Sequence, residues 1–393
     1  MRTSLQTFKN VVSKEYFVVG FLMLICALIS MQGILQGPKD YWGGTYTHYN
    51  NYVIFKQSFI HLAENKNLYD FYLHEHADLY KYSPSFALLM AVFYALPDWV
   101  GLFLWNLLNM MVLYLGIKGL PKLTWQTKIA ILMVLFFELI TATQNTQSNA
   151  LLAGLIMLAY NQFERGKTRL ASLFLIIGIF IKIYSVVGCL LFLFYPDKLK
   201  SLAYMLLWSV LIFLIPLLVV DFSSLLKQYQ NWYVLLRQDQ SESIGMSIYI
   251  YTQLFLPSNS YKIITLLFGS VLLLGPLVKW SSYSNQQFRF YYMALILLWI
   301  VLFNHKAESP TYIIAMTGVA LWYTGAKKEI FNKILLWGTV FFCSLWFTDL
   351  VPKGIKGFVD PVYVKAFFPA LVLGVVYAQL ISTKEQKINS LIE

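Results

Sequence analysis

The sequence KYSPSFALLMAVFYALPDW, residues 81–99, contains an apolar run between Pro84 and Pro97. The part of the run from Ser85 to Pro97 has 13 residues. A helix of that length spans about 20 Å at about 1.5 Å per residue, whereas the hydrocarbon core of a bilayer is about 30 Å thick. Whether this run crosses a membrane determines the side on which every later loop lies, and therefore where any chemistry takes place.

The composition is typical of a polytopic membrane protein. Of the 393 residues, 58% are hydrophobic and only 12% are charged, whereas soluble domains have about 25% charged residues. In such a protein the formal charge of +11 reports membrane orientation first, so we expect no nucleic acid partner. We therefore predict an all-α integral membrane protein with one domain over residues 1–393.

Apolar runs predict about twelve transmembrane helices. The first run, residues 16–35, is too long for a signal-peptide core, and no A-x-A cleavage site follows it. We therefore expect a retained span with the N-terminus inside. The other eleven are expected at about 99–117, 126–142, 148–162, 169–182, 184–196, 201–220, 262–279, 288–304, 311–325, 331–349 and 363–382.

The distribution of charge favours one of the two possible topologies. If residues 85–97 do not cross, 18 of the 30 basic residues lie inside with six acids, and the outer side is neutral. If they do cross, the basic clusters at 164–169 and 326–333 move outside, against the positive-inside rule. We therefore expect an outer juxtamembrane helix at about 85–97, cytoplasmic termini, and large outer loops at 37–98 and 221–261.

All five histidines are expected on the outer side. Loops are usually polar because they are solvated, but this one-sided placement favours a site for an amphipathic substrate beneath the interfacial helix. The histidines are His48, His61, His74, His76 and His305.

Motifs for several competing chemistries are missing. The sequence HEH at 74–76 offers two metal ligands but no third at a useful spacing. No D-x-D, P-loop or G-x-S-x-G motif occurs. We therefore expect no divalent metal and no cofactor.

Two charges lie at the outer ends of apolar runs, where they are expensive unless paired or facing a polar cavity. For Glu138, we favour a structural hydrogen bond. Lys182 either extends its amine to the outer headgroups or contacts the phosphate of a lipid-linked substrate. The sequence leaves both roles of Lys182 open.

Four segments, in order, resemble glycosyltransferase family 87. The helix NNYVIFKQSFIHLAENKNLYD (50–70) ends in the family's L-Y-D, and YKYSPSFALLMAVFYALPDW (80–99) is similar to its Y-P-P-x-x-x-L-L segment. TQSNALL (146–152) resembles its G-Q-x-N-x-L-L, and NHKAESPTYIIA (304–315) its late Ser-Pro segment.

The resemblance implies a GT-C fold. It implies an inverting membrane enzyme that takes a mannose-like hexose or a pentose from a polyprenyl-phosphate donor and needs no nucleotide. Transfer to a glycan or glycolipid acceptor would occur on the outer face of a bacterial-type inner or plasma membrane. In this fold the run after the first outer loop is a juxtamembrane helix, which agrees with the charge distribution.

The resemblance also implies a carboxylate base in the first outer loop, but the matched position is Asn51, which cannot accept a proton. Asp40 and His48 are the alternative bases, and Glu308 is the next candidate. Ser83, Thr146 and Ser185 also depart from the family pattern.

We expect two further groups of site residues. Lys182, His305, Lys306 and Lys56 are the candidates for binding the donor phosphate. Tyr82, Gln147, Asn149 and Ser247 are the candidates for binding the sugar or acceptor. The alternative is a catalytically inactive GT-C-like scaffold or partner subunit. A transporter is disfavoured, because polar residues gather at one face and no internal repeat is present.

Overall fold

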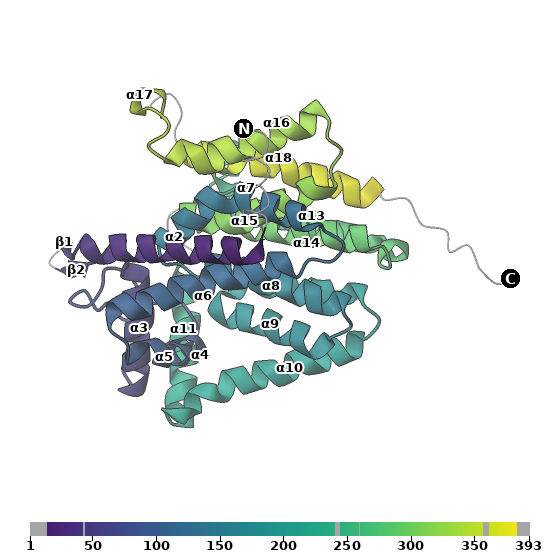
Figure 1. Cartoon of the computed structure of the whole chain (residues 1–393). Helices are drawn as coiled ribbons and strands as arrows, with labels where there is room; N and C mark the ends of the chain where they lie inside the picture. The colour runs from purple at the N-terminus through teal and green to yellow at the C-terminus, as the bar shows by residue number, and fades with distance from the viewer. Residues whose placement is uncertain (1–13, 42–43, 240–243, 259, 357–360, 383–393) are drawn as a thin grey trace. The chain divides into compact units, whose positions relative to one another are not determined.

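The structure is a computed structural model, and the regular elements of its described residues are helices apart from one pair of short strands (Figure 1). They separate into two compact units, each described here by itself. Unit 1 comprises residues 1–186 and 203–242, and unit 2 comprises residues 187–202 and 243–393. The all-α class agrees with the prediction, while a single domain over the whole chain stays a prediction. The described residues are 14–41, 44–239, 244–258, 260–356 and 361–382.

Unit 1 contains an antiparallel pair of short strands and most of the N-terminal helices. Its elements are α2 (Glu15–Leu35), β1 (Lys39–Tyr41), β2 (Gly44–Tyr46), α3 (Asn50–Ala63), α4 (Pro84–Leu89), α5 (Ala91–Tyr94), α6 (Asp98–Lys118), α7 (Trp125–Gln144), α8 (Asn149–Glu164), α9 (Thr168–Ile181), the 3-10 helix η2 (Ile215–Leu218) and α11 (Phe222–Asp239). The 3-10 helix η1 (Ile183–Phe194) and α10 (Lys198–Leu214) belong partly to each unit.

In the part of unit 2 that the structure describes, the regular elements are all helices, joined by turns and loops. Its elements are α12 (Tyr249–Phe255), α13 (Tyr261–Leu274), η3 (Gly275–Val278), η4 (Trp280–Ser282), α14 (Gln286–Leu302), η5 (Ser309–Thr311), α15 (Tyr312–Gly325), α16 (Ile330–Thr339), the π-helical turn η6 (Val340–Ser344), η7 (Leu345–Phe347), α17 (Lys353–Lys356) and α18 (Pro361–Ser382).

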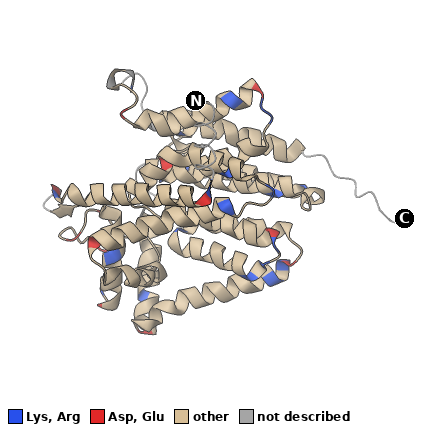
Figure 2. Ribbon diagram, in the orientation of Figure 1, with Lys and Arg blue, Asp and Glu red and all other residues tan. Residues whose placement is uncertain are grey.

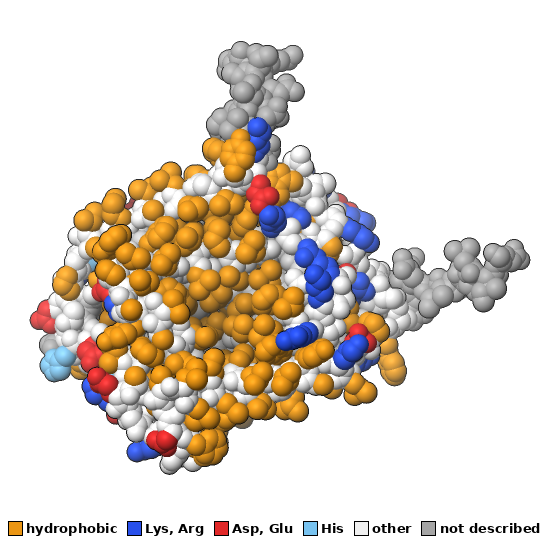
Figure 3. Space-filling view, turned by 60° about the horizontal axis from the view of Figure 1, so that its bottom comes forward, with side chains coloured by type: hydrophobic (Ala, Val, Ile, Leu, Met, Phe, Trp, Pro, Cys, Tyr) orange, Lys and Arg blue, Asp and Glu red, His pale blue; other side chains and the backbone are white. Residues whose placement is uncertain are grey.

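Seven helices in the described part of the chain are long and apolar enough to cross a membrane. The protein is therefore an integral multi-pass membrane protein. The other five predicted runs form helical segments of 12 to 17 residues, so twelve spans stay a prediction. The face in Figure 3 shows the broad hydrophobic surface expected of such a protein. The seven are Glu15–Leu35, Asp98–Lys118, Trp125–Gln144, Lys198–Leu218, Tyr261–Val278, Ile330–Phe347 and Tyr363–Ser382.

The apolar run between Pro84 and Pro97 forms two short helices instead of one span. Ser83 caps α4 by accepting a hydrogen bond from the Phe86 amide at 3.2 Å, and Pro84 occupies the first turn. The helices α4 and α5 have six and four residues, far short of the roughly 20 that a span requires. Val92 nevertheless remains 73% exposed, which fits a helix pair that lies against lipid.

Within unit 1, the ends of four helices meet in a region rich in basic side chains. Lys118 at the end of α6 forms an ion pair with Glu15 at the start of α2. The Lys128 amine, in the first turn of α7, donates to the Lys118 carbonyl at 2.6 Å, and Arg165, at the end of α8, donates to the Gly119 carbonyl. Figure 2 shows that charged residues gather mainly at helix ends.

Close packing of α6 against α8 sets the position at which α8 begins. A Cβ atom added to Gly154 would lie 2.5 Å from the Val112 carbonyl carbon, so only glycine permits this approach. The Asn161 side chain donates to the Gly116 carbonyl at 2.8 Å, and Asn109 accepts from the Leu151 amide at 3.2 Å. These contacts hold the two helices in one register.

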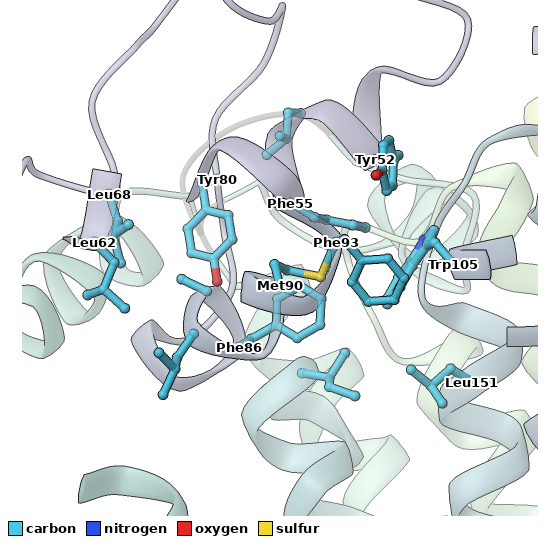
Figure 4. Packing of buried hydrophobic residues seen from close by; sticks show 14 of the residues in the cluster. Tyr52, Phe55, Leu62, Leu68, Tyr80, Phe86, Met90, Phe93, Trp105 and Leu151 are labelled. Carbon is cyan, nitrogen blue, oxygen red and sulfur yellow. The ribbon is translucent and has the colours of Figure 1, made fainter. Parts of the chain in front are cut away.

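Aromatic side chains pack α3 against α4, α5 and α6 (Figure 4). The Phe55 ring meets those of Tyr82, Phe86 and Trp105 edge to face, with centroids 4.8–5.5 Å apart, an arrangement that stabilises aromatic pairs. Phe93 meets Trp105 in the same way. This cluster fixes α3 above the start of α8.

We expect opposite labelling of cysteines placed at Glu64 and Lys167. In a background with all three native cysteines replaced by alanine, a membrane-impermeant maleimide should label Glu64→Cys in intact cells. It should label Lys167→Cys only after permeabilisation, because the positive-inside rule places that loop in the cytoplasm. Labelling of Lys167→Cys in intact cells would overturn the topology and the outer placement of the site.

Candidate active site at the start of α8

The loop between α7 and α8 begins with a Schellman-type helix end. The Gln147 amide donates to the Ala142 carbonyl at 3.3 Å and the Thr146 amide to the Thr143 carbonyl at 3.0 Å. Thr146 has φ +51°, a left-handed conformation in which glycine is usual and a β-branched residue is strained by about 1–2 kcal/mol. Glycine stands at this position in the pattern that the sequence resembles, whereas this chain holds a strained residue in the loop.

Three hydrogen bonds attach this loop to α3 and α6. The Asn51 side-chain amide donates to the Asn145 carbonyl at 2.8 Å. The Tyr52 amide donates to Thr146 Oγ1 at 3.1 Å while also reaching the Tyr49 carbonyl. The Trp105 indole donates to the Thr146 carbonyl at 2.8 Å. Each of these bonds joins a backbone group of one segment to a side chain of another, so that backbone groups near the helix ends have partners.

The first residue of α8 lies beside a lysine from the end of α9. Asn149 donates its side-chain amide to Gln147 Oε1 at 2.6 Å. Its Oδ1 atom accepts from Lys182 Nζ at 2.8 Å and from the Tyr184 hydroxyl at 3.5 Å. Asn149 is buried and Lys182 is half-buried. Hydrogen-bond donors and a positive charge therefore meet at a helix N-terminus, which is a favourable environment for an anion.

A break in the chain places Lys182 at this point. α9 ends at Ile181, and Lys182 adopts an extended conformation before η1 begins. The Lys182 amine lies 5.7 Å from the centroid of the Tyr82 ring and 5.8 Å from that of Tyr184, within the range of a cation–π contact. The two rings and Asn149 Oδ1 together orient the amine.

The structure brings together four of the site residues expected from the sequence. Tyr82, Gln147, Asn149 and Lys182 form one cluster, although three separate segments supply them. Sequence reasoning missed Tyr184. Its position two residues after Lys182 was the available signal, because an aromatic residue there can reach the same amine.

Lys56 does not join this cluster. Its amine forms an ion pair with Asp98 at 2.7 Å and donates to the Leu96 carbonyl at 3.1 Å. The pair links α3 to the N-terminus of α6, where an acidic side chain is favourable. This partner accounts for Lys56 without a ligand, and a phosphate role for it stays a prediction.

The two candidate bases that precede α3 occupy different environments. Asp40 is exposed on β1, opposite Thr45 of β2. His48 is half-buried, and its Nε2 atom is buried with no hydrogen-bond partner among the described residues. A buried ring nitrogen of this kind can accept a proton from a ligand hydroxyl that reaches it.

In unit 2, backbone hydrogen bonds bring two segments that contain site candidates next to each other. The Gly245 amide donates to the His305 carbonyl at 2.6 Å and the Met246 amide to the Ala307 carbonyl at 2.7 Å. Ser247 follows directly and is fully buried. The candidates Ser247, His305, Lys306 and Glu308 therefore lie on two adjoining segments of this unit.

Unit 2 also contains a buried lysine that sequence reasoning missed. Lys365 of α18 is 0% exposed, and its amine donates to Ser309 Oγ at 2.6 Å. The amine also lies 4.4 Å from the centroid of the Phe347 ring and 5.2 Å from that of Tyr312. A single lysine near the start of an apolar run was the sequence signal, because such a charge is expensive in a membrane.

Two histidines, one in α3 and one in the segment between α3 and α4, have structural roles. His61 is buried, stacks on Tyr72, and contacts Glu75 at 3.0 Å through Nε2. His76 is also buried, and its Nδ1 atom lies 2.9 Å from the Asp78 carbonyl. Across the described residues, no three His, Cys, Asp or Glu side chains form a metal-binding group.

We expect this histidine pair to make the loop less stable in acid. Burial lowers the pKa of His61, although Glu75 opposes the shift, and burial also lowers the pKa of His76. Their neutral forms therefore stabilise the fold above the unfolded pKa of about 6.5, and this contribution is lost as the pH falls below that value. Between pH 7.5 and pH 5, the thermal midpoint should fall more in the wild type than in His61→Gln/His76→Gln. An equal fall would contradict the assignment.

The fold and this site define an all-α membrane protein with a polar, cationic cluster at one end of its first unit. Comparison with known proteins identifies its class further. The family description "Glycosyltransferase family 87" matches residues 80–323, which is more than half of the chain. The chain belongs to this family, and the resemblance inferred from the sequence is confirmed. No curated protein matches the chain.

Proposed function

We propose that the protein transfers a hexose or pentose from a polyprenyl-phosphate donor to a glycan or lipid acceptor on the outer face of the membrane. Membership of glycosyltransferase family 87 supports sugar transfer in a membrane. The basic ends of α6 and α8 support the orientation, because the start of α8 is then at the outer side.

The contact between Lys182 and Asn149 carries the proposal. It joins a cation to the N-terminus of α8 at 2.8 Å, and both features favour a phosphate group. The surrounding apolar helices suit a polyprenyl chain. His305, Lys306 and Ser247 in unit 2 are further proposed ligand contacts.

The proposed reaction is a single inverting displacement. An acceptor hydroxyl oxygen bonds to the anomeric carbon while the bond from that carbon to the donor phosphate oxygen breaks. The polyprenyl phosphate leaves with the electron pair, and Lys182 stabilises the negative charge that develops on it. The hydroxyl proton passes to a base of the protein.

The base is proposed to be Asp40 or His48, with Glu308 of unit 2 as the next candidate. Asn51 cannot serve, because an amide does not accept a proton at neutral pH and its nitrogen already donates to Asn145. The alternative function is a catalytically inactive scaffold or partner subunit. Asn51 favours it, because a residue that cannot act as a base occupies the position where the resemblance implies one. A transfer assay decides between the two functions.

We expect purified protein in nanodiscs to release polyprenyl phosphate from at least one member of a panel of polyprenyl-phosphate hexoses and pentoses, with transfer of the sugar. Binding without transfer across the panel would support the scaffold. Neither binding nor transfer would contradict the proposed donor class.

We expect Lys182→Met to weaken binding of undecaprenyl phosphate by about 1.5–3 kcal/mol, the range for a hydrogen bond to a charged group. Lys182→Arg should weaken this binding less than Lys182→Met does, because arginine keeps the positive charge. Lys227→Met is the matched control, since Lys227 is an exposed lysine of α11 outside the cluster. Unchanged affinity in Lys182→Met would leave Lys182 with a role only at the lipid headgroups.

A further inference from the structure

We infer that Asn51 and Thr146 are positioning residues, which hold the loop between α7 and α8 in the form that binds the donor. The inference rests on the proposed function, because it concerns the same cluster of residues, which includes Gln147, Asn149 and Lys182. The two residues lie 95 positions apart in the sequence, and each makes a hydrogen bond across the contact between α3 and this loop.

Thr146 keeps a strained conformation because its side chain has a partner. Glycine would adopt φ +51° freely, but it has no oxygen to offer α3. Thr146 is only 2% exposed, and its Oγ1 atom accepts the Tyr52 amide at 3.1 Å in the first turn of α3. The Tyr49 residue that precedes α3 supplies no side-chain cap, so Thr146 completes the helix start from a distant part of the chain.

Asn51 contributes a bond that a carboxylate could not make. Its Nδ2 atom donates to the Asn145 carbonyl at 2.8 Å. An ionised aspartate has only acceptors, so at this position it would face the carbonyl oxygen with a second negative group. The loop presents the Asn145 carbonyl to α3, and the Asn51 side-chain amide supplies the donor that this carbonyl needs.

The position of the loop determines where Gln147 and Asn149 lie, because both follow within a few residues. Asn145 and Thr146 are followed directly by Gln147, which accepts from Asn149, and Asn149 accepts from Lys182. Displacement of the loop would separate Asn149 from Lys182, since a hydrogen bond weakens steeply beyond its normal length. The bonds at Asn51 and Thr146 thereby set the distance between Asn149 and Lys182, the two residues of the proposed phosphate site.

The test compares variants that remove one bond each with variants that keep it. Thr146→Val has the same shape but no acceptor, whereas Thr146→Ser keeps the hydroxyl. Asn51→Asp replaces the donor with an acceptor. Asn285→Asp is the matched control, because Asn285 caps α14 of unit 2 by accepting from the Gln287 and Phe288 amides, which aspartate does equally well.

Two measurements are made on the full chain in nanodiscs: the dissociation constant for undecaprenyl phosphate, and hydrogen exchange of the peptides covering 50–54 and 145–151. We expect Thr146→Val and Asn51→Asp to raise the dissociation constant about tenfold, corresponding to about 1.4 kcal/mol, and to speed exchange in both peptides. Thr146→Ser and Asn285→Asp should match the wild type.

Several outcomes would overturn the inference. One is a hydrogen-exchange rate in Thr146→Val and Asn51→Asp that equals the wild-type rate in both peptides. This outcome counts whether or not the wild type binds the probe. Another is a lower thermal midpoint with unchanged affinity, which indicates a role in folding alone. If Asn51→Asp does not fold, the Thr146→Val and Thr146→Ser pair carries the same test. If the wild type does not bind the probe, the proposed donor fails, and the exchange measurement still decides whether the two residues hold the loop.

Discussion

The hydrogen bonds between the end of α7 and the start of α3 are the contacts on which the candidate site depends. A helix end leaves backbone groups without partners inside the helix, and other groups have to satisfy them. Here the Asn145 and Thr146 carbonyls accept from Asn51 and Trp105, and Thr146 accepts from the Tyr52 amide. One short loop therefore connects three helices and presents Gln147 and Asn149 to Lys182. The strain at Thr146 persists because these contacts define the conformation of the loop.

The neighbouring interactions support the same region in different ways. Gly154 allows α8 to approach α6 closely, and the aromatic cluster around Phe55 holds α3 and α4 over the start of α8. The ion pair of Lys56 with Asp98 ties α3 to α6. The cation at Lys182 thus lies within a frame of packed helices, which reduces the conformational freedom that a ligand would otherwise have to remove.

Several properties followed from local sequence. The first span was expected at residues 16–35 and is α2, Glu15–Leu35, because a long apolar run has no stable alternative to a helix in lipid. Pro84 and Pro97 were expected to bound a separate short helical run, and the structure has α4 and α5 between them. The reason is that proline favours the first turn of a helix and interrupts its interior. The family also followed from the sequence, through ordered motifs. The number of spans did not, because five apolar runs are too short for length alone to decide.

The sequence by itself therefore determined the class of protein, the positions of its long apolar helices and the types of residue available for a site. Only the tertiary structure decided which of these residues meet. Lys182 and Asn149 are 33 positions apart, and Asn51 and Asn145 are 94 apart, so no local periodicity relates them. Lys56 and Lys182 look alike as outer lysines, yet one faces Asp98 and the other faces the start of α8. The reason is that helix packing and the paths of the loops, which depend on the whole chain, set these distances.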